Sequence, residues 1–367
     1  MKRILIISTP VGPLGSGVGG GVDLTLHSLV LGLTGRGHHV EVLAPERSLH
    51  VGTVLHQIPG ALQPSAHTAE RDTPIVIPAE GVLAAMCEWA RGHQDEFDVI
   101  LNLAYDWLPF YLTPFFVATP LAHLVSMATL SDAMDGVIER AAALRPLNLA
   151  MHSRAQADTF PTLADVVPVV GSGLAVERYD MHITADEPRH LGFIGRISPE
   201  KGLADVVAVA EATGLPLKVW GLMQDPTVWD AAIAAHPAAD VSYKGFLPTD
   251  DLQAAVGGCA AIVMAPKWVE AFGNVAIEAM ATGVPVIPYR RGGPAEIIVD
   301  GETGFLVEPD DVDGLIAAVG RIDELDRVEC RQRVEEEYSS QAFAARVEKW
   351  LDAVIECHRN SWFSEPA

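Results

Sequence analysis

The chain has 367 residues, of which 49% are hydrophobic, and it carries a formal net charge of −23. A chain of this length exceeds one ordinary hydrophobic core, so we expect two domains. The strong negative charge argues against nucleic acid and anionic membranes as partners, because both bind through basic surfaces. No apolar run is long enough to span a membrane, and we expect no stable membrane association.

The N-terminus and the cysteines bear on the cellular location. The start, "MKRILIIS", has the basic and apolar composition of a signal peptide, but Thr9, Pro10 and Gly12 follow at once. A buried first strand is the preferred interpretation. The cysteines are far apart and fit neither a zinc site nor a disulfide framework, so we expect a reducing, cytoplasmic environment and no metal. They are Cys87, Cys259, Cys330 and Cys357.

The first half of the chain alternates predicted strands and helices. "RILIIS" is apolar and β-branched, which is typical of a buried parallel strand. A helix is predicted from about Val22 to Arg36, because its leucines recur near helical spacing and glycines follow. Further strands are predicted at "HVEVLAP", "FDVILNL", "PLAHLV" and "NLAMHS".

The second half repeats this alternation after the polar stretch "MHITADEP", which indicates a linker. Strands are predicted at "RHLGFIG", "LKVWG", "VSYKG", "AAIVMAP", "PVIPY" and "GFLVE", with helices from Leu203, about Asn274 and Val312. We therefore predict an α/β protein with two Rossmann-like, parallel-sheet domains at residues 1–183 and 188–340. The remaining residues, 341–367, contain an amphipathic helix that is expected to pack back on the first domain.

Parallel sheets of this kind bind ligands beyond the carboxyl ends of their strands, so motifs that follow strands carry most weight. The first is the glycine-rich "TPVGPLGSGVGGGVDLTL", where backbone amides can approach a phosphate or sugar. A nicotinamide dinucleotide is disfavoured, because the second strand ends with Ala44 and Pro45 and the loop is long. The remaining alternative is a loop without a ligand.

The second motif, "GFIGRISPEKG", places Gly195, Arg196 and Lys201 after a strand. On an acidic protein, two such cations suit a diphosphate, which Arg contacts with a fork and Lys as a point charge. The alternative is a solvated charged turn, since Glu200 adjoins Lys201.

The third motif is "PKWVEAFGNVAIEAM". Gly273 precedes a helix whose first amides form an anion site, with Glu270 before it and Glu278 one turn inside. The spacing suits a ligand with a sugar, a diphosphate and a nucleoside. The alternatives are ordinary surface acids, or the acid and base of a glycosidase, which would not explain the adjacent cations.

The stretches "EAFGNVAIEAMATGVPVI" and "RGGPAEIIVDGETGFLVEP" resemble the retaining glycosyltransferases of family 4. These have the GT-B fold, in which two Rossmann-like domains face a central cleft, and they carry an E-x7-E motif, here Glu270 to Glu278. "AYDWLP", "VVGSGLAVERY" and "GRISPEKG" are similar to further segments of that family.

The resemblance implies the roles of individual residues. Arg196 and Lys201 would hold the diphosphate, and Glu270 the hydroxyls of the donor sugar; these three form the catalytic set. The implied donor-binding residues are Gly19, Gly20, Gly195, Phe246, Phe272, Gly273, Asn274, Val275 and Glu278.

The chain also departs from the family. Ser126 takes the place of a His found in many relatives, and His123 lies three residues earlier, so either is a candidate for the donor sugar. Lys267 and Trp268 replace commoner small residues. The family is thought to react on one face of the sugar, the leaving phosphate taking the acceptor's proton. The implied reaction uses a UDP-sugar as co-substrate, with no cofactor and no metal.

The acceptor is expected to be a small soluble molecule. "AYDWLPFYLTPFF" is rich in aromatic residues, which fits either core packing or a stacking wall for a flat acceptor. This segment, "STPVGPLGSGVGGGVDLTL" and "PKWVEAFGNVAIEA" are similar to the UDP-glucose:tetrahydrobiopterin glucosyltransferases, which implies a reduced pterin glucosylated on its side-chain hydroxyl. Other small acceptors, a nicotinamide oxidoreductase, and a sugar-nucleotide-binding protein without turnover are the alternatives. The candidate acceptor residues are Asp23, Tyr105, Asp106 and Trp107.

Overall fold

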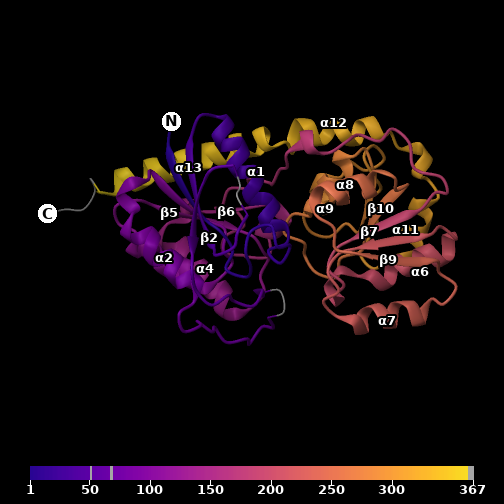
Figure 1. Ribbon diagram of the computed structural model, residues 1–367, viewed down its shortest axis with the longest axis horizontal. Coiled ribbons are helices and arrows are strands. Elements are labelled where there is room, and N and C mark those ends of the chain that lie inside the picture. Colours follow the sequence, from indigo (N-terminus) through magenta and orange to yellow (C-terminus); the bar gives the residue numbers. More distant parts are fainter. Residues whose placement is uncertain (50–51, 67–68, 363–367) are drawn as a thin grey trace. The chain divides into compact units, whose positions relative to one another are not determined.

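The computed structural model describes residues 1–49, 52–66 and 69–362. The chain forms two compact units (Figure 1): unit 1 is Met1–Leu174 with Ser340–Ala367, and unit 2 is Ala175–Ser339. The chain passes into unit 2 earlier than the predicted boundary at residue 183. The reason is local, because Tyr179 bonds to Glu278 and Arg331 of unit 2.

Unit 1 is built on a six-stranded sheet with the order β3-β2-β1-β4-β5-β6, in which all neighbours are parallel. Its strands are β1 Arg3–Ile7, β2 His39–Pro45, β3 Val54–Ile58, β4 Val99–Asn102, β5 Leu121–Val125 and β6 Leu149–Met151. Its helices are α1 Gly21–Gly35, α2 Val82–Gly92, α3 Trp107–Leu112, α4 Asp132–Leu144, α5 Arg154–Ala157 and α13 Ser340–Trp362. Short 3₁₀ helices lie at Gln94–Glu96, Thr113–Phe115 and Pro146–Asn148.

Strand β3 is an element that the sequence pattern did not reveal. It forms the edge of the sheet, and only Ile58 of its residues is buried. Its polar residues therefore break the apolar run by which the buried strands are recognised. The five other strands lie where they were predicted.

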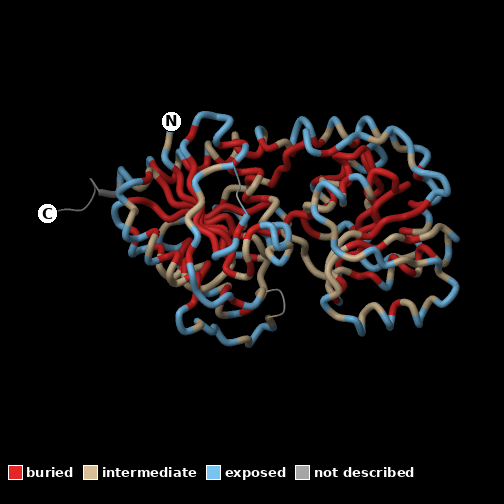
Figure 2. The backbone as a smooth tube through the Cα atoms, viewed as in Figure 1, coloured by how far each residue is buried: buried red, intermediate tan, exposed pale blue. Residues whose placement is uncertain are grey.

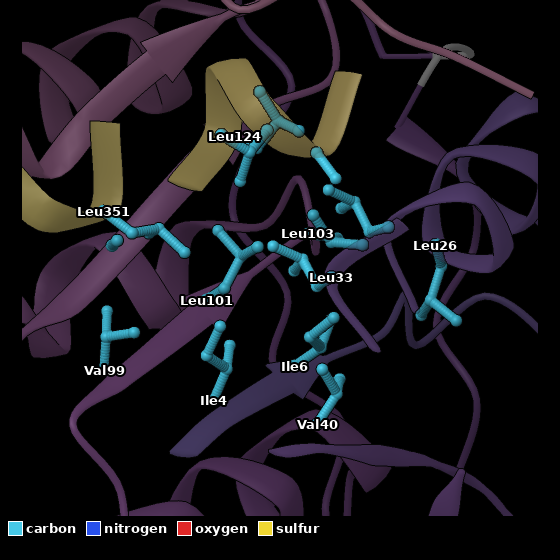
Figure 3. Close-up of a cluster of buried hydrophobic side chains, with 14 of the residues drawn as sticks. Ile4, Ile6, Leu26, Leu33, Val40, Val99, Leu101, Leu103, Leu124 and Leu351 are labelled. Atoms are coloured by element: carbon cyan, nitrogen blue, oxygen red, sulfur yellow. The ribbon is translucent and has the colours of Figure 1, made fainter. Parts of the chain in front are cut away.

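The last helix, α13, belongs to unit 1 and packs on its core. Phe343, Val347 and Leu351 are fully buried in the same cluster as α1 residues and the strands β1, β2 and β4. Figure 3 shows Leu351 among the side chains of this cluster, and Figure 2 shows the strands as the buried centre of the unit. The indole of Trp350 also donates a 2.7 Å hydrogen bond to the carbonyl of Leu147.

Unit 2 repeats the architecture with a five-stranded parallel sheet in the order β11-β10-β7-β8-β9. Its strands are β7 Leu191–Ile194, β8 Leu217–Trp220, β9 Val241–Gly245, β10 Ala261–Met264 and β11 Val286–Pro288. Its helices are α6 Leu203–Thr213, α7 Pro226–Ala235, α8 Thr249–Gly257, α9 Asn274–Ala281, α10 Pro294–Ile297, α11 Val312–Val319 and α12 Arg327–Glu337, with 3₁₀ helices at Val176–Arg178, Pro199–Lys201 and Ile322–Glu324. The predicted strand at "GFLVE" was wrong, because Gly304 and Val307 make only isolated bridges to neighbouring residues.

We expect Gly32→Ala to destabilise unit 1. A Cβ at Gly32 would lie 2.2 Å from the carbonyl oxygen of Ser340, so α1 and α13 would have to separate. The free energy of unfolding, measured by urea titration with circular dichroism, should fall by about 1–3 kcal/mol. The control is Gly136→Ala in α4, where no atom lies within 4 Å of the added carbon; it should stabilise by about 0.5–1 kcal/mol. Equal stabilities would contradict the α1–α13 packing.

Candidate active site

The strand order of unit 2 reverses between β7 and β10, which are adjacent and parallel. The loops that follow these two strands therefore leave the same edge of the sheet next to each other, where open parallel sheets bind their ligands. The amide of Lys267 donates a 2.8 Å hydrogen bond to the carbonyl of Glu200, which ties the two loops together. Gly202 allows this approach, because a Cβ there would lie 1.9 Å from the carbonyl oxygen of Ala265.

Lys201 and Glu270, one from each loop, form an ion pair with 2.6 Å between Nζ and Oε2. Their side chains are 19% and 18% exposed, so the pair is largely shielded from solvent but still accessible to a ligand. The indole N–H of Trp268 donates to the same Oε2 at 3.0 Å. Burial opposes ionisation of Glu270, but Lys201 and these two hydrogen bonds outweigh it and lower the pKa of this carboxyl. Glu270 is therefore a carboxylate at neutral pH.

Arg196 lies in the same loop as Lys201. Its Nη2 is 3.4 Å from Glu200 Oε1, and its Nε is buried without a partner in the described part of the chain. Glu200 also accepts a 2.7 Å hydrogen bond from the hydroxyl of Ser198. Glu200 thus pairs with Arg196 inside the turn, while Lys201 pairs with Glu270 of the other loop.

The Phe272–Gly273 turn opens helix α9. Gly273 has φ 100°, a left-handed conformation that favours glycine, and no side chain caps the helix start. The turn is braced by Gly293, whose amide donates to the carbonyl of Glu270 at 2.8 Å. The ring of Phe272 packs on Tyr338 at 5.7 Å, so only its backbone can serve a ligand. Asn274 and Val275 follow as the first, half-buried residues of α9.

Glu278 lies one turn inside α9, as predicted. The hydroxyl of Tyr179 donates a 3.3 Å hydrogen bond to its Oε1. Burial raises the pKa of Glu278 to about 7, and the Tyr179 bond only partly offsets this. Near neutral pH the carboxyl is therefore partly protonated and can donate as well as accept a hydrogen bond.

Gly195 follows β7 and Phe246 follows β9, so both lie at the carboxyl edge of the same sheet, with β8 between the two strands. A Cβ at Gly195 would make only ordinary contacts, the nearest at 3.6 Å. Gly221 follows β8, and its amide donates to the carbonyl of Gly245, the residue before Phe246. The ring of Phe246 is 45% exposed, which is high for a large apolar side chain and leaves a face for a planar group.

In unit 1 the predicted glycine loop runs from the end of β1 to α1. Gly20 has φ 58° and precedes the helix. Asp23 lies beneath the loop: its Oδ2 accepts from the amide of Gly15 at 3.2 Å, and a Cβ at Gly19 would lie 2.2 Å from its Oδ1. Burial raises the pKa of Asp23 to about 6. Asp23 therefore supports the glycine loop through its Oδ2.

His123 and Ser126 prove to be very different residues. His123 is fully buried in β5, with its ring nitrogens 3.2 Å from Asn102 Nδ2 and 2.9 Å from Thr113 Oγ1. Burial lowers the pKa of this imidazole to about 3, so it stays neutral. His123 is thus a hydrogen-bonded core residue, which favours Ser126 of the two candidates for the donor sugar. Ser126 follows β5 at the carboxyl edge of the sheet and is partly exposed.

The other three candidate acceptor residues follow β4, at the strand-order reversal of unit 1. Asp106 caps α3 through the amide of Leu108 at 3.0 Å and accepts from Gln63 Nε2 at 3.0 Å. Trp107 stacks on Tyr111 with 4.5 Å between ring centroids. Both rings are half-buried, as is Tyr105, whose hydroxyl reaches the carbonyl of Ala128 at 3.4 Å.

The sequence did not reveal that Trp268 and Gln63 contact candidate site residues. Trp268 donates to Glu270, and Gln63 donates to Asp106. Trp268 stood out only as an unusual residue beside the motif. Gln63 carries no local signal, because its contact with Asp106 joins positions that are distant in the chain.

The residues that follow β1 and β2 bear on whether the glycine-rich loop binds a nicotinamide dinucleotide. Strand β2 ends at Pro45 and the next residue is Glu46, which is exposed, so an acid does follow the second strand. The loop between β1 and α1, however, occupies residues 8–20. This is much longer than the tight turn of a dinucleotide fingerprint. The loop length is what disfavours a nicotinamide cofactor.

Comparison with known proteins agrees with this architecture. Residues 180–338, nearly all of unit 2, match the family model described as Glycosyl transferases group 1. Anabaena Alr3699/HepE, solved in complex with UDP and glucose, is 16% identical, covers 96% of this chain and all of its own, and superposes with a TM-score of 0.74. The chain therefore has the GT-B fold, and its second unit is similar to the group 1 glycosyltransferases through the match of residues 180–338.

Two curated relatives extend the comparison. A glycogen synthase of Mycobacterium tuberculosis is 32% identical over 168 residues, which cover 43% of this chain and 40% of the relative. A D-inositol 3-phosphate glycosyltransferase of Nocardia farcinica is 26% identical over 90% of this chain and 84% of its own length. The match to the glycogen synthase thus spans about two fifths of that protein.

The described residues meet the requirements of neither a membrane-spanning helix nor a metal site. None of the described helices is both long and apolar enough to cross a membrane. Across residues 1–49, 52–66 and 69–362, no group of three or more potential metal ligands comes together.

We expect Glu278→Gln to change how stability depends on pH. Between about pH 4.5 and pH 7 the folded protein holds a proton on Glu278 that the unfolded chain has lost, so stability falls as pH rises through this window. The variant lacks this proton. Its stability relative to the parent should therefore rise across the window, by at most about 3 kcal/mol, and level off above it. Urea unfolding at a series of pH values measures this.

The matched control for Glu278→Gln is Glu329→Gln, an exposed position on α12. A stability difference for Glu278→Gln that does not change with pH would show that Glu278 is not held in its protonated form by burial.

Proposed function

We propose that the protein is a glycosyltransferase that takes its sugar from a nucleoside-diphosphate donor. The observation that carries this proposal is the Lys201–Glu270 ion pair at the strand-order reversal of unit 2, next to Arg196 and the uncapped start of α9. This arrangement offers positive charge and a helix start for a diphosphate, and beside them a carboxylate for sugar hydroxyls.

The charges suit the donor's phosphates. The chain has a net charge of −23, so an anionic substrate must be held by local cations. Arg196 has an unpaired buried Nε, and Lys201 is reachable. Glu278, which can donate or accept a hydrogen bond near neutral pH, is suited to ribose hydroxyls, and the exposed ring of Phe246 to the base.

We propose a retaining reaction on one face of the sugar. The acceptor oxygen bonds to the anomeric carbon as the bond from that carbon to the phosphate oxygen breaks, and the leaving phosphate oxygen takes the acceptor's proton. Arg196, Lys201 and the first amides of α9 stabilise the negative charge that develops on the leaving diphosphate. Because these groups supply the positive charge, we propose that the reaction is independent of metal and needs no cofactor.

We propose UDP-glucose as the donor and a small soluble acceptor, with a reduced pterin as the specific candidate. The donor is suggested by the similarity to the family and by a fold neighbour solved with UDP and glucose. The pterin rests on the resemblance of three segments to pterin glucosyltransferases, together with the half-buried rings of Tyr105 and Trp107 beside Asp106. The four unpaired cysteines fit the cytoplasmic location proposed for such an enzyme.

We expect Lys201→Ala and Arg196→Ala each to weaken UDP binding by about 10–100-fold, since each removes a charge-assisted contact to phosphate. Calorimetric titration with UDP measures this. Lys349→Ala, at an exposed lysine of α13, is the charge-matched control and should bind UDP like the parent. Failure of the parent protein to bind any nucleotide would overturn the proposal.

Glu270→Gln separates sugar recognition from phosphate binding. The substitution frees Lys201 from its ion pair, so UDP should bind at least as tightly as to the parent. Transfer from UDP-glucose should fall by about 100-fold or more, because the carboxylate no longer orients the sugar in the transition state. The assay is UDP release from UDP-glucose with and without tetrahydrobiopterin.

Whether UDP release depends on tetrahydrobiopterin decides what the assay says about the acceptor. Release that depends on tetrahydrobiopterin supports both donor and acceptor. Tight UDP binding without pterin-dependent release keeps the glycosyltransferase and discards the pterin. Full activity of Glu270→Gln would contradict the role proposed for this carboxylate.

A further inference from the structure

Trp268 contacts both members of the ion pair at the candidate site. Its indole N–H donates to Glu270 Oε2 at 3.0 Å, and the ammonium of Lys201 lies 5.0 Å from the centroid of its ring. Lys201 and Glu270 are themselves 2.6 Å apart. The three side chains form a closed triangle, in which a cation, an anion and an aromatic ring each touch the other two.

The two carboxylate oxygens of Glu270 differ in the hydrogen bonds that they accept. Lys201 and Trp268 both donate to Oε2 of Glu270, and Oε1 accepts no hydrogen bond from the described residues. A carboxylate held by two donors on one oxygen loses most of its freedom to rotate. The other oxygen then keeps one direction, which is what the recognition of a particular hydroxyl requires.

The loop that carries Trp268 is itself held rigidly. Lys267 bonds to Asp205 at 2.5 Å and to Asp310 at 2.8 Å, and Arg291 donates to the carbonyl of Pro266 at 2.7 Å. Trp268 is half-buried in this loop. Its ring therefore has a fixed place from which to support Lys201 and Glu270.

We propose that Trp268 is a positioning residue, whose indole N–H orients Glu270 toward the hydroxyls of the donor sugar while its ring holds Lys201 near the diphosphate. This inference rests on the proposed function and goes further, because it assigns sugar recognition to a side chain that the family pattern does not contain. An aromatic ring attracts a cation through its face and leaves the ammonium's N–H groups free to donate. The same side chain thereby serves both ends of the sugar–phosphate linkage.

The substitution Trp268→Phe tests the proposal, since it keeps a ring below Lys201 and removes only the N–H donor. Trp229→Phe is the matched control, because Trp229 packs on Tyr243 in the same unit and takes no part in the triangle. The primary readout is the ratio of the dissociation constants for UDP-glucose and UDP, measured by calorimetry for each protein. UDP binding by the variant also shows that unit 2 is folded.

We expect Trp268→Phe to bind UDP within about threefold of the parent, while the UDP-glucose to UDP ratio worsens by about tenfold. The indole N–H lowers the pKa of Glu270, so its loss raises that pKa. As the pH is lowered, UDP-glucose binding by Trp268→Phe should therefore begin to weaken at a higher pH than binding by the parent does. In a Glu270→Gln background, the same Trp268→Phe change should have little further effect on the ratio.

Other results would overturn the inference. An unchanged ratio and pH dependence would show that Trp268 is only packing, and the proposed function would stand. An equal loss for UDP and UDP-glucose would assign Trp268 to phosphate binding or to the fold. If the parent binds neither ligand, the proposed function fails and the inference fails with it. Trp268→Leu, which also removes the ring, should lose a further severalfold in UDP affinity if the ring supports Lys201.

Discussion

The ion pair between Lys201 and Glu270 is the interaction on which the candidate site depends. It joins two loops that are far apart in the chain and adjacent only because β7 and β10 are neighbours in the sheet. A shielded ion pair is worth little as net stability, since desolvation offsets much of the attraction. Its value is geometric, because removing either partner leaves a charge that must find another ion or a hydrogen-bonding group. A diphosphate beside Lys201 and hydroxyls beside Glu270 are such partners.

The electrostatics of the site contrast with those of the whole molecule. The chain is strongly acidic, yet the loops after β7, β10 and β11 carry Arg196, Lys201, Lys267 and Arg291. Lys267 and Arg291 are committed to Asp205 and Asp310 and brace the loop. Arg196 and Lys201 have weaker or exchangeable commitments. These partners separate the two cations that brace the loop from the two that are proposed to bind the donor.

Much of the fold could be predicted because buried parallel strands are continuous apolar runs. The strands of both units other than β3 lie where they were predicted, although β9 is no apolar run and has no buried side chain. Helices α6, α9 and α11 begin at the predicted residues, and α1 begins one residue before its predicted start. The edge strand β3 was not predicted because its solvent-exposed positions interrupt the apolar run. The segment "GFLVE" was predicted as a strand because it is apolar, but it makes only isolated bridges. Pattern alone does not tell whether a partner strand is present.

The candidate site divides in the same way. The sequence by itself determined that Arg196, Lys201, Glu270 and Glu278 belong to loops and a helix start that follow parallel strands, because glycines and local spacing specify these turns. Only the tertiary structure decided that Lys201 pairs with Glu270, that Trp268 completes the triangle, and that His123 is a core residue. These outcomes depend on contacts between side chains that are distant in sequence, and on burial, which no local pattern encodes.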